Sequence, residues 1–148
     1  MRLSKNDYSK LEEYFKNYND LKEQQRFRRY EILYRPSDNN SGGGKTNIPH
    51  SPVENEVITL NKDLKYRNIA AAIQAVEDVY RLSTPEQKLL IEYRYWDKDP
   101  TVFEWEDIAH EMTKLRDDNK IISRHAALRM RKHILMALAK RIGWVTFG

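Results

Sequence analysis

Apolar residues recur along this chain at steps of three and four positions, the spacing that gathers them on one face of an α-helix. The first such stripe consists of Leu11, Tyr14, Phe15, Tyr18, Leu21, Ile32 and Leu33. Segments in which β-branched residues alternate with polar ones are nearly absent, so strands are not expected. The pattern therefore predicts an all-α fold that opens with an N-terminal helix from Asp7 to Tyr34.

A second stripe begins after Ser51, which suits an N-cap, and Pro52, which suits the first helical position. It continues to about Leu82 and predicts a long central helix, which Asn61 and Asp63 either bend or interrupt. A helix of about thirty residues is long for a small domain. It indicates a core scaffold or a surface shared with a second chain, so a homodimer is one expectation.

Three shorter helices are expected from residue 84 onward. Residues 84–87, with the sequence TPEQ, have the form of a capping box with proline at the first helical position. A short helix is expected over about residues 104–112. Ser123 then caps a last helix that runs to about Ile142, where Gly143 provides a C-terminal stop.

The segment between the first two helical regions is rich in glycine and proline, which predicts a flexible loop over residues 35–51. Gly44, Lys45 and Thr46 match the end of a phosphate-binding loop, G-x-x-x-x-G-K-[ST]. The earlier glycine of that motif falls on Asn39, no strand precedes it, and Pro49 disfavours the helix that should follow. A nucleotide-dependent enzyme is therefore not indicated.

No other catalytic or metal-binding set is indicated. The chain has no cysteine, which excludes disulfides, cysteine nucleophiles and thiolate zinc sites. His110 and Glu111 lack the second histidine of a zinc motif, because the required position holds Lys114. His125 and His133 are eight positions apart, about two helical turns, which is too far to share a metal ion. We therefore expect no catalysis, no cofactor and no metal.

The positive charge of the chain is concentrated at its C-terminal end. The net charge is +4 and the isoelectric point is about 9.2. From residue 113 to the end, nine Lys or Arg residues stand against Asp117 and Asp118, a net charge of +7, so the preceding residues sum to −3. A basic end on a mildly acidic body is typical of a protein that binds a polyanion. A basic solvated surface without a ligand is the alternative interpretation.

The last two predicted helices have the pattern of a helix-turn-helix over about residues 104–142, with the small residue Ala109 where two helices cross closely. Ser123 caps the second helix, whose N-terminus attracts a phosphate. Arg124 and His125 are expected to reach base edges. The residues expected to neutralise phosphates are Lys120, Arg129, Arg131, Lys132 and Lys140. A basic amphipathic helix packed in a bundle or against another protein is the alternative.

The expected organisation is a helical arm over residues 1–34, the flexible loop over 35–51, and a helical DNA-binding domain over 52–148. No apolar run approaches the roughly 20 residues that a membrane span needs, and the N-terminus lacks the apolar core of a signal peptide. We therefore expect a soluble protein of the cytoplasm that does not bind a membrane.

Three stretches from Leu82 onward resemble region 4 of bacterial sigma factors, a module of short helices that ends in a helix-turn-helix. They are LSTPEQKLLIEYRYW from Leu82, FEWEDIAHEM from Phe103, and ISRHAALRMRK from Ile122. With PSDNNSGGGK, SPVENEV and the closing RIGW, most of residues 30–146 resembles the RinA family of phage transcriptional activators. The ArpU-type phage regulators are a near neighbour of that family.

The resemblance implies a sequence-specific DNA-binding regulator that activates late phage genes in a bacterial cell, with double-stranded DNA and the host RNA polymerase as partners. A small terminase subunit, which packages DNA, and a module that binds polymerase without touching DNA are the alternatives. The chain departs from the helix-turn-helix pattern in the length of the turn between the two helices. Met112 and Ser123 are eleven positions apart, so either the first helix extends to about Leu115 or the turn is a longer loop.

Overall fold

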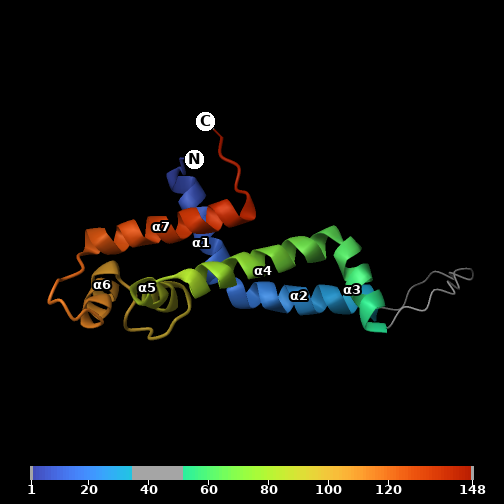
Figure 1. Ribbon diagram of the computed structural model, residues 1–148, viewed down its shortest axis with the longest axis horizontal. Coiled ribbons are helices and arrows are strands. Elements are labelled where there is room, and N and C mark those ends of the chain that lie inside the picture. Colours follow the sequence, from blue (N-terminus) through green and yellow to red (C-terminus); the bar gives the residue numbers. More distant parts are fainter. Residues whose placement is uncertain (1, 35–51, 148) are drawn as a thin grey trace, which may run out of the picture. The chain divides into compact units, whose positions relative to one another are not determined.

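The computed structural model describes residues 2–34 and 52–147 (Figure 1). Its described residues form helices without any strand, which confirms the all-α fold. The helices are α1 (Lys5–Lys16), α2 (Tyr18–Leu33), α3 (Pro52–Lys62), α4 (Leu64–Leu82), α5 (Pro85–Tyr95), α6 (Trp105–Lys114) and α7 (Arg124–Ile142). The predicted glycine loop and the predicted cap at Ser51 lie outside the described residues.

The single helix predicted over residues 7–34 is wrong, because the chain divides there into α1 and α2. Ser4 and Asp7 form a capping box that starts α1, with Ser4 Oγ accepting from the Asp7 N–H at 3.0 Å. Asn17 ends α1, and its own N–H donates to the carbonyl of Glu13 at 2.9 Å. The apolar stripe continues through this break, which is why the spacing alone did not show it.

The long central helix is interrupted at Asp63, one of the two alternatives that the sequence left open. Asp63 donates its N–H to the carbonyl of Leu60 at 3.1 Å, closing the last turn of α3. Its carboxylate accepts from the N–H of Tyr66 at 2.7 Å, as an N-cap does, and so begins α4. One short acidic side chain therefore ends one helix and starts the next.

The chain forms two compact units, whose described residues are 2–18 and 72–147 in unit 1 and 19–34 and 52–71 in unit 2. This division differs from the predicted arm over residues 1–34, because α1 belongs to unit 1. Leu11 and Phe15 of α1 are fully buried there, and each contributes about 1.5–3 kcal/mol by leaving water. The α1 helix is therefore part of a core and not an appended arm.

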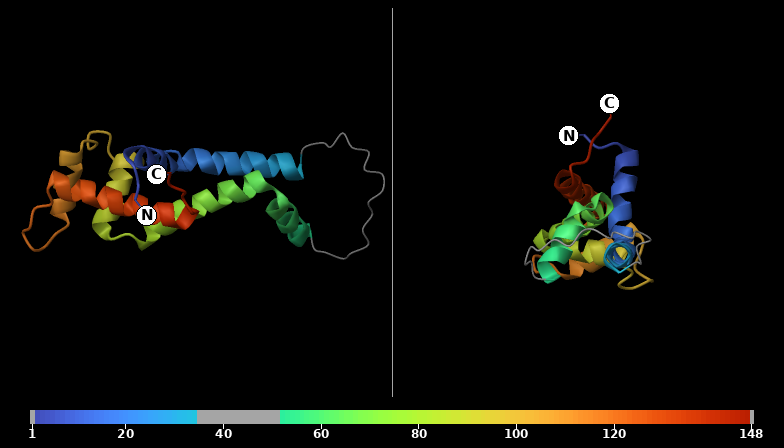
Figure 2. Two further views of the ribbon diagram at one scale, coloured as in Figure 1. Left: turned by 90° about the horizontal axis from the view of Figure 1, so that it is seen from above. Right: turned by 90° about the vertical axis from the view of Figure 1, so that its right-hand side faces the viewer.

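The core of unit 1 is built by α1, α5, α6, α7 and the C-terminal part of α4. In Figure 1, α5 and α6 lie along the N-terminal half of α7, and the further views in Figure 2 also show α7 beside α1. The largest fully buried side chains are Phe15, Leu11, Leu90, Ile91, Ile108, Met112, Leu135, Leu138 and Val76. These helices hold one face of α7 inward and leave the other face in solvent.

The caps predicted for unit 1 are confirmed. Thr84 Oγ1 accepts from the N–H of Gln87 at 3.2 Å, and the Gln87 side chain accepts from the Thr84 N–H at 3.0 Å, which completes the capping box. Gly143 ends α7 in the left-handed conformation, with φ of 69°. None of the described helices is long and apolar enough to cross a membrane.

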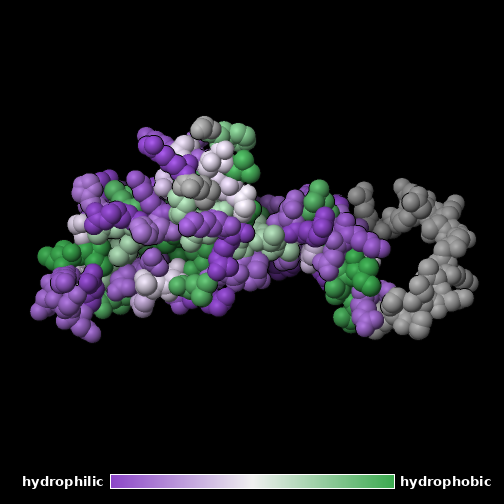
Figure 3. Space-filling model, turned by 45° about the horizontal axis from the view of Figure 1, so that its top comes forward, coloured by the Kyte–Doolittle hydropathy of each residue, from purple (hydrophilic) through white to green (hydrophobic). Residues whose placement is uncertain are grey.

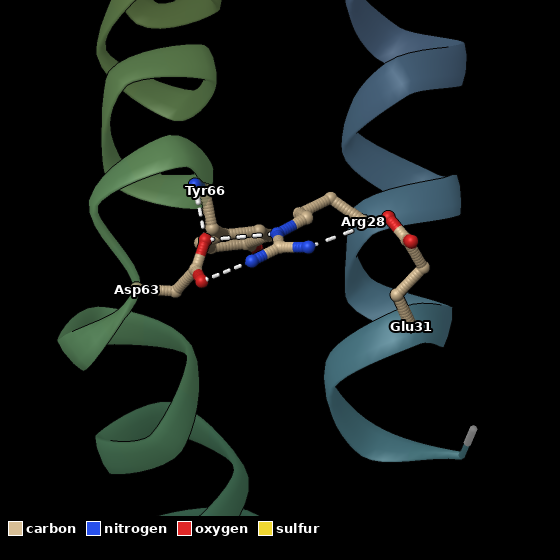
Figure 4. Close-up of polar contacts among 4 residues, drawn as sticks. All are labelled: Arg28, Glu31, Asp63 and Tyr66. Atoms are coloured by element: carbon tan, nitrogen blue, oxygen red, sulfur yellow. Dashed lines mark hydrogen bonds and ion pairs between the residues drawn. The ribbon is translucent and has the colours of Figure 1, made fainter. Parts of the chain in front are cut away.

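Unit 2 is a pair of helical segments, α2 on one side and α3 with the start of α4 on the other (Figure 4). The guanidinium of Arg28 donates to both carboxylate oxygens of Asp63, at 3.0 and 2.5 Å. Arg29 also pairs with Glu56, at 3.0 Å. The hydrogen bond from Arg28, supported by the N–H of Tyr66, lowers the pKa of Asp63 to about 2.

Candidate nucleic-acid interface

The α6 and α7 helices pack against each other and form the predicted helical pair. Ile108, Ala109 and Met112 of α6 are buried in the core that α6 and α7 share. The α6 helix extends two residues beyond the predicted end, to Lys114, and the connection still spans residues 115–123. Both explanations of the long spacing therefore hold, since the helix is longer and the turn is also an extended loop.

The loop between α6 and α7 is tied to the body of unit 1. The N–H of Ile122, a buried residue, donates to Thr113 Oγ1 at 2.9 Å. Asp118 accepts from the guanidinium of Arg116 at 3.1 and 2.8 Å and from the N–H of Lys120 at 3.1 Å. The hydrogen bond from Arg116 lowers the pKa of Asp118 below its ordinary value. These contacts fix the position at which α7 begins.

Ser123 caps α7 as the sequence predicts. Its backbone is extended, and its Oγ accepts from the N–H of Ala126 at 3.1 Å. The first turn of α7 contains no acidic residue. The free N–H groups and the positive end of the helix dipole therefore remain a suitable site for an anion.

The α7 helix contains six Lys or Arg residues and no acidic residue. Three of the six are paired with acids from other helices. The pairs are Arg124 with Glu106 of α6 at 3.0 Å, Arg131 with Glu12 of α1 at 2.6 Å, and Arg141 with Asp78 of α4 at 3.2 Å. The other three, Arg129, Lys132 and Lys140, have no acidic partner among the residues that the structure describes.

The unpaired cations share one face of α7. Arg129, Lys132 and Lys140, together with His125 and His133, are spaced at three, four, seven and eight positions and therefore fall on one side of a helix. All five are exposed. We call this set the basic face. It begins in the first turn of α7, at the capped N-terminus, and continues to the last turn.

Tyr8 of α1 borders the basic face. Its ring lies under Lys132, with Nζ 5.9 Å from the ring centroid, and also contacts Arg131, with Cζ at 5.5 Å. A groove of about 400 Å³ is lined there by Tyr8, Lys132, His133, Met136, Ala137 and Lys140. Tyr8 could not be predicted as part of the site, because it joins the site only when α1 packs on α7.

Arg131 does not belong to the basic face, although the sequence predicts it as a phosphate contact. Its guanidinium donates twice to Glu12, at 2.6 and 3.0 Å, and the hydroxyl of Tyr95 donates to the same carboxylate. Burial works against the charged form of Glu12, but hydrogen bonds from Arg131 and Tyr95 outweigh it and lower the pKa of Glu12. Burial, with the charge of Glu12, raises the pKa of Tyr95.

The structure brings together most of the other residues predicted for the site. Ser123, Arg124, His125, Arg129, Lys132 and Lys140 all lie on or at the start of α7, and Lys120 is exposed on the loop before it. Arg124 is half exposed and its partner Glu106 is 65% exposed, so this ion pair is weak and open to exchange. His133 and Tyr8 are the additions that the structure makes to the set.

A family model of proteins of unknown function, DUF722, matches residues 7–140. The chain belongs to the DUF722 family. The match begins within α1, includes both described parts of unit 2 and ends at Lys140 of the basic face. No curated protein and no solved structure matches this DUF722 chain.

Proposed function

We propose that this DUF722 protein is a sequence-specific DNA-binding regulator encoded by a phage, which activates late genes, with α7 as the helix that enters the major groove. The basic face of α7 carries the proposal. It is a row of exposed cations without acidic partners among the described residues, and it starts at a capped helix end free of acids. By contrast, Arg124 and Arg141 of the same helix are each paired with an acid, Glu106 and Asp78.

The positions along α7 suggest separate roles. Recognition helices present their N-terminal residues to base edges. His125 and Arg129, one turn apart, occupy that position, and Arg124 joins them if DNA displaces Glu106. Lys132 and Lys140, further along the same face, and Lys120 on the preceding loop meet the phosphates on either side. The N–H groups behind Ser123 bind a further phosphate.

The support given by α5 and α6 fits this role. In a helix-turn-helix, the first helix crosses the DNA backbone and holds the second at a fixed angle in the groove. The buried contacts of Ala109 and Met112 and the tied loop at Thr113 and Ile122 hold α7 in this way. The resemblance of residues 82–132 to sigma region 4 supports a further contact with the host RNA polymerase.

Binding to duplex fragments from the late promoter region of the phage tests the proposal. The variant Arg129→Ala/Lys132→Ala/Lys140→Ala removes three cations, so the slope of log affinity against log salt falls by about 2.7 and affinity at low salt drops at least about 100-fold. Arg141→Ala is the single-charge control, since it removes one cation from the same helix, where Asp78 already pairs with it, and each single variant of the triple is compared with it.

Two further measurements separate the parts of the proposal. If binding is sequence-specific, a scrambled duplex of equal length competes poorly with the promoter fragment for the protein. If the protein is an activator, expression of a reporter gene behind the late promoter rises with the wild-type protein and not with the triple variant. Equal salt slopes for the triple variant and the wild type would show that α7 does not contact DNA.

A further inference from the structure

Unit 2 buries very little of its own apolar surface. Among its described residues, Leu60 and Ile69 are its buried hydrophobic side chains, and α2 has none. Ordering each residue costs about 1–2 kcal/mol, while burying one large apolar side chain contributes about 1.5–3 kcal/mol. Leu21, Ile32 and Leu33 of α2 are only partly buried. The fully buried core of unit 2 is therefore small, and a further packing surface would add to it.

The outer side of α2 carries a stripe of aromatic residues. Phe27, Tyr30 and Tyr34 are spaced at three and four positions and are 65%, 55% and 54% exposed. The rings of Tyr30 and Tyr34 lie 6.1 Å apart. The less exposed positions of α2, which include Arg28 in its contact with Asp63, lie on the roughly opposite side of the helix. The stripe thus faces away from the rest of unit 2.

The α3 helix and the start of α4 add exposed aliphatic side chains. They are Val53, Val57, Ile58 and Leu64, each more than two-fifths exposed. Figure 3 shows hydrophobic side chains gathered on the surface over α3. With the aromatic stripe, these aliphatic side chains bring to seven the large apolar side chains of the described part of unit 2 that are more than two-fifths exposed. A stable protein interface covers roughly 800 Å² on each partner, and large apolar side chains such as these form its centre.

The charges of unit 2 favour a second copy over a strongly charged partner. Its described residues include six acidic and seven basic residues, mixed along both segments, so two copies meet without net repulsion. Unit 2 has no region of a single charge sign that would attract a strongly charged partner such as a nucleic acid. Two helical segments from each of two copies form a four-helix arrangement, and an isologous contact uses the same surface twice.

We propose that the aromatic stripe Phe27–Tyr30–Tyr34 and the aliphatic side chains of α3 form a homodimer interface between two copies of unit 2. This proposal stands on unit 2 alone and does not require that α7 bind DNA. If both proposals hold, the dimer carries two recognition helices and binds a site with two-fold symmetry.

Sedimentation equilibrium of the full chain, without DNA, tests the dimer. The wild type is expected to sediment as a dimer at micromolar concentration, and Phe27→Glu/Tyr30→Glu as a monomer. Val145→Glu is the control, because Val145 is 67% exposed in unit 1 and outside the proposed surface. A wild-type chain that stays monomeric at every concentration overturns the proposal. A ring of many subunits also overturns it and favours the alternative function as a small terminase subunit.

A cysteine cross-link tests the same surface without disturbing charge. The chain has no cysteine, so a single introduced thiol forms a disulfide only with a second copy. Oxidised Tyr30→Cys is expected to give a covalent dimer at a concentration where Val145→Cys stays monomeric. Equal cross-linking of the two variants overturns the proposed surface. Because neither experiment contains DNA, their failure leaves the function of α7 to be judged separately.

Discussion

Arg131 of α7 and Glu12 of α1 are 119 positions apart in the chain and form a two-pronged ion pair, with Nη2 2.6 Å from Oε1 and Nε 3.0 Å from Oε2. The hydroxyl of Tyr95 in α5 donates to the same carboxylate. One carboxylate therefore joins three helices of unit 1. It also removes Arg131 from the cations that α7 presents to solvent, while Arg129 and Lys132 on either side of it stay exposed.

Loss of this carboxylate is expected to destabilise unit 1. The side chains of Arg131 and Glu12 are only 18% and 11% exposed, so Glu12→Gln leaves a mostly buried guanidinium without its counter-charge. We expect the free energy of unfolding to fall by about 3 kcal/mol, and by about 1 kcal/mol for Tyr95→Phe, which removes one hydrogen bond. Urea denaturation followed by circular dichroism measures both. A Glu12→Gln chain as stable as the wild type contradicts a structural role for the pair.

The same pair makes stability depend on pH in the acid range. The pKa of Glu12 is lowered in the folded chain, since hydrogen bonds from Arg131 and Tyr95 outweigh its burial. A lowered folded pKa adds stability that is present above the ordinary value of 4.5 and is lost as pH falls through the folded pKa. We expect the free energy of unfolding to fall below about pH 5, and to fall less steeply in Glu12→Gln. Identical pH profiles for the two chains contradict this assignment.

Local patterns in the sequence were sufficient to predict several helix ends. The caps at Thr84 and Ser123 and the stop at Gly143 depend on side chains within three residues of the helix end, so a short stretch contains the whole interaction. The break at Asn17 was not predicted, because the apolar spacing continues through it. The spacing of apolar residues indicates which face of a helix is buried, but it does not indicate whether the helix is continuous.

The distinction between paired and unpaired cations could not be predicted from the sequence. Arg129 and Arg131 are two positions apart on one basic helix and look alike as residues. What separates them is Glu12, which reaches α7 only after α1 has packed into the core. Tyr8 joins the site by the same packing. Contacts of this kind connect distant parts of the chain, and no local spacing encodes them.

Release of Arg124 from Glu106 is expected to strengthen DNA binding. Glu106→Gln removes an exposed negative charge beside the start of α7 and frees the guanidinium, which lies 3.0 Å away. We expect affinity at low salt to rise by about three- to tenfold, corresponding to roughly 1 kcal/mol. Glu111→Gln is the matched control, because it neutralises an ion-paired glutamate on the same helix, bound to Lys114. Fluorescence anisotropy with a labelled duplex measures both, and equal gains would point to a general charge effect.

Asp63 is expected to stabilise the junction between α3 and α4 by two separable interactions. Asp63→Asn keeps an oxygen that accepts from the Tyr66 N–H but loses the charge that pairs with Arg28, while Asp63→Ala loses both. Tryptic cleavage at Lys62 and Lys65 should therefore be slowest in the wild type and fastest in Asp63→Ala. Since the pKa of Asp63 is lowered to about 2, its contribution is complete above 3.8 and is lost only as pH falls toward 2. Cleavage rates in the reverse order contradict this division.

The cap of α7 is expected to serve both stability and binding, and the cap of α5 provides the comparison. Ser123→Ala and Thr84→Ala each remove one side-chain oxygen that accepts from a first-turn N–H, so each lowers the free energy of unfolding by about 1 kcal/mol. We expect only Ser123→Ala to weaken DNA binding as well, because it loosens the helix end at which a phosphate is proposed to bind.

Ser123→Asp separates the two roles of this cap. Aspartate caps a helix as well as serine does, so stability is kept, but its charge repels a phosphate at the same helix end. We expect near wild-type unfolding in urea together with a loss of DNA affinity larger than that of Ser123→Ala. Ser123→Thr, which keeps a neutral capping hydroxyl, should restore both properties. If Ser123→Asp binds the duplex as tightly as Ser123→Thr, no phosphate lies at the N-terminus of α7, and the DNA must contact the helix further along the basic face.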